Sequence, residues 1–320
     1  MKVITSGSAY LDIDAYACCI AYAELLNLQG IPARAVSSAK PNASVSKTVL
    51  GWGAVLQDYH PTSNDEFVLV DVSDYHHFDP LVALDRVVEV IDHHPGFEKY
   101  WAQTLGANAD IRPIGAAATQ IFQRWKAAKL LSRISEQSAA LLATAILDNT
   151  LNFTGQMTTT ADIDAYAELA PHAKLTADWP EQYFLECQTA IESDICAALA
   201  ADLKRMKPDS LLPQVFAQMT VWDANALLER HRSTINDWMA GQGDDWLLNL
   251  ISIRDQKSCL LANSVVSQQK LSHLLSLDWE AGMAVLEPSM LRKELLKLSL
   301  QDTRLQPAIH HEQEFNSGWD

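Results

Sequence analysis

The chain has 320 residues, a length typical of two domains, and 48% of them are hydrophobic, which is enough for packed cores. Its formal net charge of −16 argues against a nucleic-acid backbone as the main partner, because proteins that bind one usually carry a basic surface. No uninterrupted apolar window of membrane-spanning length and no signal-peptide pattern occurs. The five cysteines form no CxxC pair. We therefore expect a cytoplasmic protein with free thiols.

The first half of the chain alternates strand-type and helix-type patterns. Short apolar runs predict strands at 2–6, 33–37, 67–70 and 87–91, and apolar residues at helical spacing predict a helix from 14 to about 29. The pattern is helical again from 114 to about 147 and from 162 to 170. This alternation predicts an α/β domain, with a parallel sheet and helices on both faces. Ligands of such sheets bind beyond the carboxyl ends of the strands.

The second half predicts a smaller mixed α+β domain. A helical stretch over 181–206 links the domains. It is followed by strand-type and helix-type patterns at 214–221, 223–239, 246–253, 258–265, from 268, and at 283–286. The expected boundaries are 1–190 for the first domain, 197–305 for the second and 306–320 for a polar tail.

Four segments offer oxygen or imidazole ligands for metal ions. Asp12 and Asp14 follow the first strand, and in an extended loop residues two apart face the same way. Two later strands end at Asp71 and at Asp92-His93-His94, and Asp148 closes an apolar run. Two divalent ions held about 3.5–4 Å apart by such ligands can clamp a phosphoryl group and activate water. Oxygen and nitrogen ligands suit Mg²⁺, Mn²⁺ or Co²⁺.

Each segment also has an ordinary structural interpretation. Asp14 could cap the helix that follows it, and an acidic residue at a strand end is more often a turn former than a ligand. The pair His76-His77 is typical of a solvated turn. The order and placement of all four segments together favour the metal site.

In this order the segments resemble the DHH phosphoesterase superfamily, and best its branch of family II (manganese-dependent) inorganic pyrophosphatases and exopolyphosphatases. Val90-Ile91-Asp92-His93-His94 resembles the motif that names the superfamily, and the residues from Leu147 to Phe153, followed by Thr158-Thr159-Thr160 and Asp162, resemble its "DT-L-F … T-D" signature. Gly115-Ala116-Ala117-Ala118-Thr119 resembles the small-residue helix start that follows the DHH strand. The resemblance covers roughly residues 2–300.

The resemblance implies an N-terminal DHH domain that binds two divalent ions, Mg²⁺ or Mn²⁺, with Co²⁺ as a further candidate. Asp71 would bridge the two ions and His94 would contact substrate phosphate. The metal ligands it implies are Asp12, Asp14, Asp71, His93 and Asp148.

The second domain resembles that of the pyrophosphatase branch, because the sequence lacks the glycine-rich GGGH segment of the nucleic-acid hydrolases. Asp202-Leu203-Lys204 resembles its "D-K" segment, and Ser289 to Lys293 resembles its "S-R-K" segment, with two residues between Ser289 and Arg292. The resemblance implies that Lys204, Arg292 and Lys293 bind phosphate oxygens from a lid domain that closes over the active site. The alternative for Arg292 and Lys293 is a solvated helix start.

One position departs from the family. Family II pyrophosphatases carry a first-metal histidine in the loop before the two aspartates, and here that residue is Ser8. The resemblance implies hydrolysis of pyrophosphate or polyphosphate by two-metal activation of water, with a small phosphate compound as partner and neither duplex nucleic acid nor a membrane. The alternatives are a prune-like nucleotide phosphodiesterase, or a catalytically reduced protein that binds phosphate compounds or a protein partner.

Overall fold

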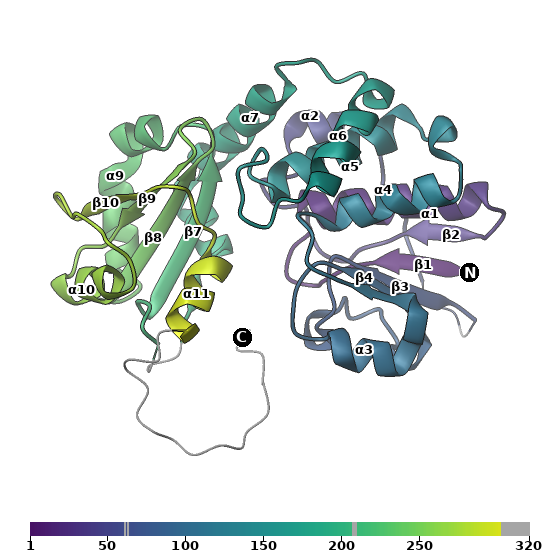
Figure 1. Cartoon of the computed structure of the whole chain (residues 1–320), viewed down its shortest axis with the longest axis horizontal. Helices are drawn as coiled ribbons and strands as arrows, with labels where there is room; N and C mark the ends of the chain where they lie inside the picture. Colours follow the sequence, from purple (N-terminus) through teal and green to yellow (C-terminus); the bar gives the residue numbers. More distant parts are fainter. Residues whose placement is uncertain (61, 63, 207–209, 302–320) are drawn as a thin grey trace. The chain divides into compact units, whose positions relative to one another are not determined.

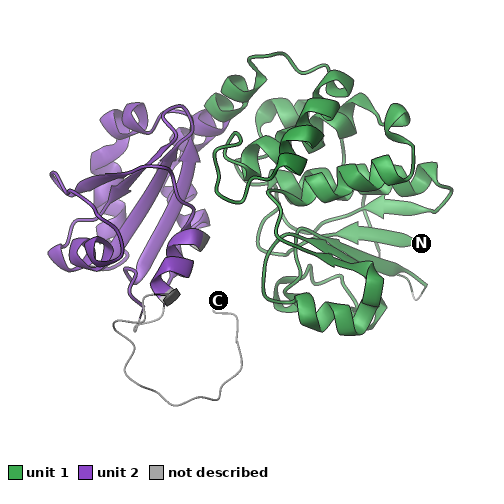
Figure 2. Ribbon diagram, in the orientation of Figure 1, with its two compact units in different colours: residues 1–186 green, residues 187–320 purple. Residues whose placement is uncertain are grey.

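The computed structural model describes residues 1–60, 62, 64–206 and 210–301, which form two compact units (Figure 1, Figure 2). Unit 1 is Met1–Glu186 and unit 2 is Cys187–Asp320, and helix α7 (Trp179–Ser193) runs from one into the other. The predicted polar tail, 306–320, lies outside the described residues. No helix in the described ranges is long and apolar enough to cross a membrane.

The sheet of unit 1 is fully parallel, as predicted, with the strand order β2-β1-β3-β4-β5. Its strands are β1 (Lys2–Thr5), β2 (Ala33–Ala35), β3 (Glu66–Val70), β4 (Val87–Asp92) and β5 (Ala109–Ile111). The connection from β1 leads to β2 on one side of it, and the later strands are added on its other side, so the topological switch point lies between β1 and β3. Ligands of open parallel sheets bind beyond the carboxyl ends of the strands at such a point. The sequence did not predict β5, because it has only three residues and one of them is Asp110.

Helices cover both faces of this sheet, α1 and α4 on one and α3 on the other (Figure 1). Phe67 and Leu69 pack with Trp101 of α3, and Val68 and Val70 alternate to the opposite face, where they are also buried. The helices of unit 1 that precede α7 are α1 (Ile13–Leu28), α2 (Lys47–Gly51), α3 (Glu98–Leu105), α4 (Ala117–Ala127), α5 (Glu136–Asn149) and α6 (Thr160–Ala173). Short 3-10 turns are η1 (Tyr75–His77), η2 (Leu84–Arg86), η3 (Gly106–Asn108) and η4 (Leu131–Arg133).

Local side chains fix where these helices begin. The carboxylate of Asp12 accepts a hydrogen bond from the amide of Ala15 at 2.9 Å, so Asp12, and not Asp14, is the N-cap of α1. Asp14 lies instead in the buried first turn. The helical pattern predicted over 114–147 is divided into α4 and α5, because Lys129 has a left-handed backbone (φ 57°) that ends the first helix.

Unit 2 is the predicted mixed α+β domain, with a sheet in the order β10-β9-β8-β7-β6. Among the described strands of this sheet, only β7 and β8 pair in parallel. One core joins β7 and β8 to α8 and α9, and a second, built around Phe216 and Leu247, packs against α10 and α11. The elements are α8 (Ile195–Ala201), β6 (Lys204–Arg205), β7 (Val215–Val221), α9 (Ala224–Ala240), β8 (Trp246–Ser252), β9 (Lys257–Leu261), α10 (Val265–Leu274), β10 (Met283–Leu286) and α11 (Arg292–Gln301).

Two boundaries in unit 2 differ from the sequence prediction. The helical stretch expected over 181–206 breaks at Asp194, which caps α8, and ends at Ala201, so Lys204 lies in a strand. The strand expected over 258–265 ends at Leu261, because Ser264 accepts a hydrogen bond from the amide of Ser267 and starts α10. In both cases a capping side chain overrides the apolar pattern.

Candidate metal centre

Three side chains meet where β3 and β4 end. Asp71 directly follows β3, and His93 and His94 directly follow β4. Asp71 Oδ1 lies 3.3 Å from His93 Nε2 and 3.8 Å from His94 Nδ1. Each of the three residues offers one potential ligand atom, and these atoms lie within 4.8 Å of one another. The parallel register of β3 and β4 thus assembles a cluster that could hold a metal ion.

His93 is oriented by the backbone. Its Nδ1 lies 3.0 Å from the carbonyl oxygen of Ile114, and because a carbonyl only accepts hydrogen bonds, Nδ1 carries the proton. When the ring is neutral, its lone pair is then on Nε2, which faces Asp71. Among the described residues the buried Asp71 Oδ1 accepts no hydrogen bond. Two lone pairs that face each other in a buried site require a cation or a proton, so the donor set fits a divalent ion.

Asp12 and Asp14 bring further negative charge. Asp14 is fully buried, and its two oxygens accept hydrogen bonds of 2.8 Å from the amides of Ala117 and Ala118 at the start of α4. Asp14 Oδ2 keeps a further lone pair, whereas Oδ1 also accepts from the Cys18 thiol at 3.4 Å. Burial raises the pKa of Asp14 well above its ordinary value, and the charge of Asp71 raises it further. Burial also raises the pKa of Asp71, and the charge of Asp12 adds to the effect. A bound cation would relieve this repulsion.

Asp148 lies in the last turn of α5 and is held by a tyrosine. Partial burial raises its pKa to about 7, and the hydrogen bond from the Tyr183 hydroxyl, at 2.9 Å, acts in the opposite direction. The charge of Asp12 also raises the pKa of Asp148. It therefore raises the pKa of all three carboxyl groups, those of Asp14, Asp71 and Asp148. No sequence pattern indicated Tyr183, because it lies 35 residues beyond Asp148 inside an ordinary helical pattern.

The segment after Asp148 has an unusual backbone. Leu151, Asn152 and Phe153 have φ values of 51°, 54° and 67°, so three consecutive residues other than glycine are left-handed. The hydroxyl of Thr150 accepts a hydrogen bond from the amide of Phe153 at 3.1 Å, which helps to hold this turn. Such conformations persist only where surrounding contacts enforce them, and they cluster at functional sites.

Asp92 orients the two histidines of the DHH motif. Its Oδ1 accepts hydrogen bonds from the amides of His93 (2.7 Å) and His94 (3.1 Å) and lies 2.8 Å from His94 Nδ1. Burial acts to raise the pKa of Asp92, but the neighbouring His94 and His93 outweigh it and hold this pKa below its ordinary value. The His94 side chain is 46% exposed, so it can contact a solute.

The predicted cations of unit 2 have different surroundings. Lys204 lies in β6, and Arg292 is the first residue of α11. The guanidinium of Arg292 forms a two-pronged pair with the Asp202 carboxylate, at 2.9 Å to each oxygen, and lies over the Phe216 ring at 5.5 Å from the centroid. The side chain of Lys293 lies outside the described part of the structure.

Ser8 contacts η1, the turn that contains His76 and His77, through hydrogen bonds to its backbone. The amide of Ser8 donates to the carbonyl of His77 at 2.9 Å, and its hydroxyl donates to the same oxygen at 3.3 Å. His76 and His77 are exposed and lie against Asp74, at 2.8 and 3.7 Å, as a solvated turn would place them.

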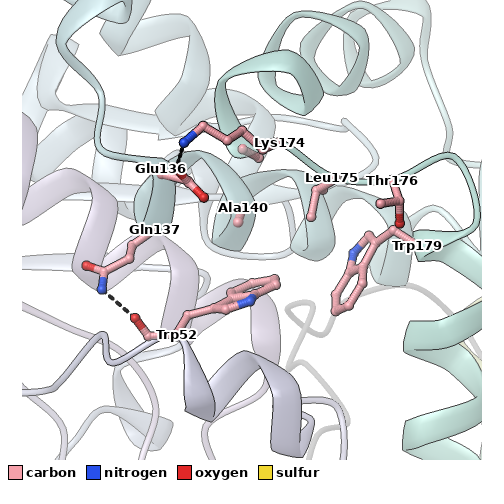
Figure 3. Close-up of a pocket in the computed structure, with 9 residues that line it drawn as sticks. Trp52, Glu136, Gln137, Ala140, Lys174, Leu175, Thr176 and Trp179 are labelled. Carbon is pink, nitrogen blue, oxygen red and sulfur yellow. Dashed lines mark hydrogen bonds and ion pairs between the residues drawn. The ribbon is translucent and has the colours of Figure 1, made fainter.

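A pocket in unit 1 is a separate feature from these residues. A pocket of about 490 Å³ is lined by Trp52, Trp179, Lys174 and residues at the start of α5 (Figure 3). The two indole rings lie 5.2 Å apart between centroids. None of the predicted metal ligands lines this pocket, which adjoins the end of α5 opposite Asp148. The predicted metal ligands and this pocket are therefore separate features of unit 1.

Comparison with known proteins finds relatives that cover most of the chain. The chain is 26% identical over 312 residues to a Bacillus pumilus protein assigned as a manganese-dependent inorganic pyrophosphatase. This match covers 94% of the present chain and 98% of the Bacillus protein. A Deinococcus radiodurans protein with the same assignment is 30% identical over 204 residues, 61% of this chain and 60% of its own length. No family model matches the chain.

Solved structures show the fold. A Methanococcus jannaschii protein assigned to the family II inorganic pyrophosphatases matches with a TM-score of 0.66 and 18% identity, over 94% of this chain and all (100%) of that one. The predicted resemblance to family II inorganic pyrophosphatases is confirmed. An exopolyphosphatase-related protein from Bacteroides fragilis matches with a TM-score of 0.51 and 14% identity, over 94% of this chain and 90% of that one. The family II pyrophosphatase fold thus spans both units of the chain.

Proposed function

We propose that the protein hydrolyses phosphoanhydride bonds of inorganic pyrophosphate or polyphosphate with the help of two divalent ions. The observation that carries this proposal is the cluster of Asp71, His93 and His94, with Asp12 and Asp14 beside it. Burial raises the pKa of Asp14 and of Asp71, and His93 turns a lone pair toward Asp71. Such an arrangement is costly unless cations neutralise it.

In this proposal the metal ligands are Asp12, Asp14, Asp71, His93 and Asp148, with Asp71 shared by both ions. The ions would supply Lewis-acid stabilisation of phosphoryl charge and lower the pKa of water at the site. Manganese is the first candidate, because the relatives named above are assigned as manganese-dependent. Magnesium and cobalt accept the same kinds of ligand.

The other residues of the proposal act on the substrate. His94 is exposed enough to contact a phosphate oxygen, and Asp92 holds its ring. Lys204, Arg292 and Lys293 would donate charge-assisted hydrogen bonds to phosphate and supply positive charge that a chain of net charge −16 otherwise lacks. We place the protein in the cytoplasm with a small phosphate compound as its partner, and with neither duplex nucleic acid nor a membrane.

A substrate panel tests this proposal. Phosphate release would be measured from pyrophosphate, from polyphosphates of several lengths and from cyclic nucleotides, each with Mn²⁺, Mg²⁺ or Co²⁺. We expect turnover of pyrophosphate or polyphosphate. Preferred cleavage of the nucleotides would favour the phosphodiesterase alternative, for which the one specific observation is Ser8 at the position of the family histidine. Metal binding without any turnover would indicate a binding protein.

A further inference from the structure

The segment Ile114 to Ala118 touches two of the proposed metal ligands at once. The carbonyl of Ile114 accepts from His93 Nδ1, and the amides of Ala117 and Ala118 donate to the two oxygens of Asp14. These contacts decide which way the imidazole and the carboxylate point. Whatever fixes this segment therefore fixes the orientation of both ligands.

Asp162, in the first turn of α6, accepts hydrogen bonds from residues near both ends of this segment. Its carboxylate is fully buried, and it accepts hydrogen bonds from the amide of Gly115 at 3.1 Å and from the hydroxyl of Thr119 at 2.6 Å. Its Oδ2 also accepts from the amide and hydroxyl of Thr159, at 2.8 and 2.7 Å, within the capping box of α6. Asp162 thus anchors the start of α4 to the start of α6.

The geometry of the peptide bond carries this anchoring to His93. The carbonyl of Ile114 and the amide of Gly115 belong to one planar trans peptide, in which the C=O and N–H point in opposite directions. Holding the Gly115 N–H on Asp162 therefore aims the Ile114 carbonyl at His93. The fit is close, because a Cβ on Gly115 would lie 2.6 Å from Asp162 Oδ2 and 2.7 Å from Thr150 Cγ2.

We propose that Asp162 is a positioning residue of the metal centre, which orients His93 and Asp14 through the segment Ile114 to Ala118. This inference rests on the proposed function, because it assumes that His93 and Asp14 bind metal. Groups that orient a metal ligand from outside the coordination sphere commonly change metal affinity about 10- to 100-fold when they are removed.

The test compares Mn²⁺ affinity, measured by calorimetry on metal-free full-length protein, with the thermal midpoint of the same metal-free protein. In Asp162→Ala we expect Mn²⁺ binding to weaken about 10-fold or more. Asp162→Asn should recover most of the affinity, because an amide can accept from Gly115 with its oxygen and donate to Thr119 with its nitrogen. Thr119→Val removes the hydrogen bond from the Thr119 hydroxyl to Asp162 and should give a smaller loss of Mn²⁺ affinity. This variant keeps the test decisive if Asp162→Ala does not fold.

A matched control is Glu24→Ala. The Glu24 carboxylate also anchors a helix start, because it accepts from the amide and hydroxyl of Ser135, at 2.8 and 2.6 Å, where α5 begins. It touches none of the proposed ligands, so Glu24→Ala should lower the thermal midpoint and leave Mn²⁺ affinity unchanged.

The outcomes separate the two proposals. Wild-type Mn²⁺ affinity in Asp162→Ala and Thr119→Val, with a lowered thermal midpoint as in Glu24→Ala, would give Asp162 a purely structural role and overturn this inference alone. A wild-type protein that binds no divalent ion would overturn the proposed function and this inference with it.

Discussion

Asp71 has a backbone conformation that few side chains adopt, with φ at 56° in the left-handed region. Aspartate and asparagine tolerate this region better than other residues with a side chain. We therefore expect Asp71→Asn to fold, and its metal-free form to be at least as stable as wild type, because the substitution removes a buried carboxylate beside Asp12. One amide oxygen cannot serve two ions as a carboxylate can, so hydrolysis and Mn²⁺ binding should be lost.

Calorimetric Mn²⁺ titration and phosphate release would measure these losses, and circular dichroism would check the fold. Asp74→Asn is the control, since Asp74 lies against the exposed His76 and should be dispensable. Near-normal turnover in Asp71→Asn would contradict the two-metal site.

The pKa of Asp148, about 7 in the metal-free protein against an ordinary value of 3.8, predicts a pH dependence. Between these two values the folded protein holds a proton that the unfolded chain has released, so stability of the metal-free protein falls as pH rises across this window. Asp148 contributes at most about 4 kcal/mol to this change in the free energy of unfolding, and less than that because its side chain is partly exposed. Asp148→Asn should flatten this part of the stability profile.

The same proton competes with the metal. Because a carboxylate must be ionised to bind a cation, Mn²⁺ affinity should rise with pH over the range around pH 7 in which Asp148 loses its proton. Tyr183→Phe removes a hydrogen bond that lowers the pKa of Asp148, so it should move this rise to higher pH. Calorimetry in buffers of different ionisation enthalpy would count the protons released. Equal proton release by Asp148→Asn and wild type at pH 6 would contradict this account.

At the scale of elements, the loop between β1 and α1 would determine how many protein ligands the first metal of the proposed centre receives. With Ser8 in place of the family histidine, the proposed first site would have only Asp12 and Asp71 from the protein, and water or substrate would complete it. Mg²⁺ tolerates such a site, because it commonly keeps several waters. We therefore expect the wild type to bind its first metal loosely and to work with Mg²⁺.

Ser8→His should tighten Mn²⁺ or Co²⁺ binding and shift the metal preference toward these ions, because imidazole is a borderline nitrogen ligand. Metal titration of both proteins, together with turnover for each ion, would measure the shift. Tight binding of two Mn²⁺ ions by the wild type without substrate would contradict this prediction and would direct attention to His76 and His77, whose turn contacts Ser8.

At the scale of the whole molecule, the proposed metal ligands and the proposed phosphate-binding cations belong to different units, so variants should separate the two proposed functions. Arg292→Ala removes a paired, largely buried guanidinium and leaves Asp202 without this partner, so unit 2 should lose stability. If Arg292 also binds phosphate, the substitution should weaken substrate binding and transition-state stabilisation by roughly 1.5–3 kcal/mol. Mn²⁺ affinity should not change.

Steady-state kinetics, Mn²⁺ calorimetry and thermal unfolding of Arg292→Ala would measure these three effects. Arg254→Ala is the control, because Arg254 pairs with Asp223 and Asp255 but is 47% exposed, and such a pair contributes little. Destabilisation of Arg292→Ala with unchanged kinetics would assign Arg292 to the structure of unit 2 alone.

The sequence by itself was sufficient for the fold class and for the acidic loops. Apolar runs of strand length that end at Asp71 and Asp92 are local features, and the parallel pairing of β3 with β4 places the two residues at one edge of the sheet. Local patterns were weaker at element boundaries, where the side chains of Asp194 and Ser264 start helices within apolar stretches.

Tertiary structure alone decided which groups hold the ligands in place. Asp162 meets the amide of Gly115 across 47 positions of sequence, and Tyr183 meets Asp148 across 35. Arg292, for which the sequence predicted either phosphate binding or a solvated helix start, pairs with Asp202 across 90 positions. Periodicity and capping act over a few residues, whereas these hydrogen bonds form only after helices and strands have packed, so no local pattern in the sequence could have predicted them.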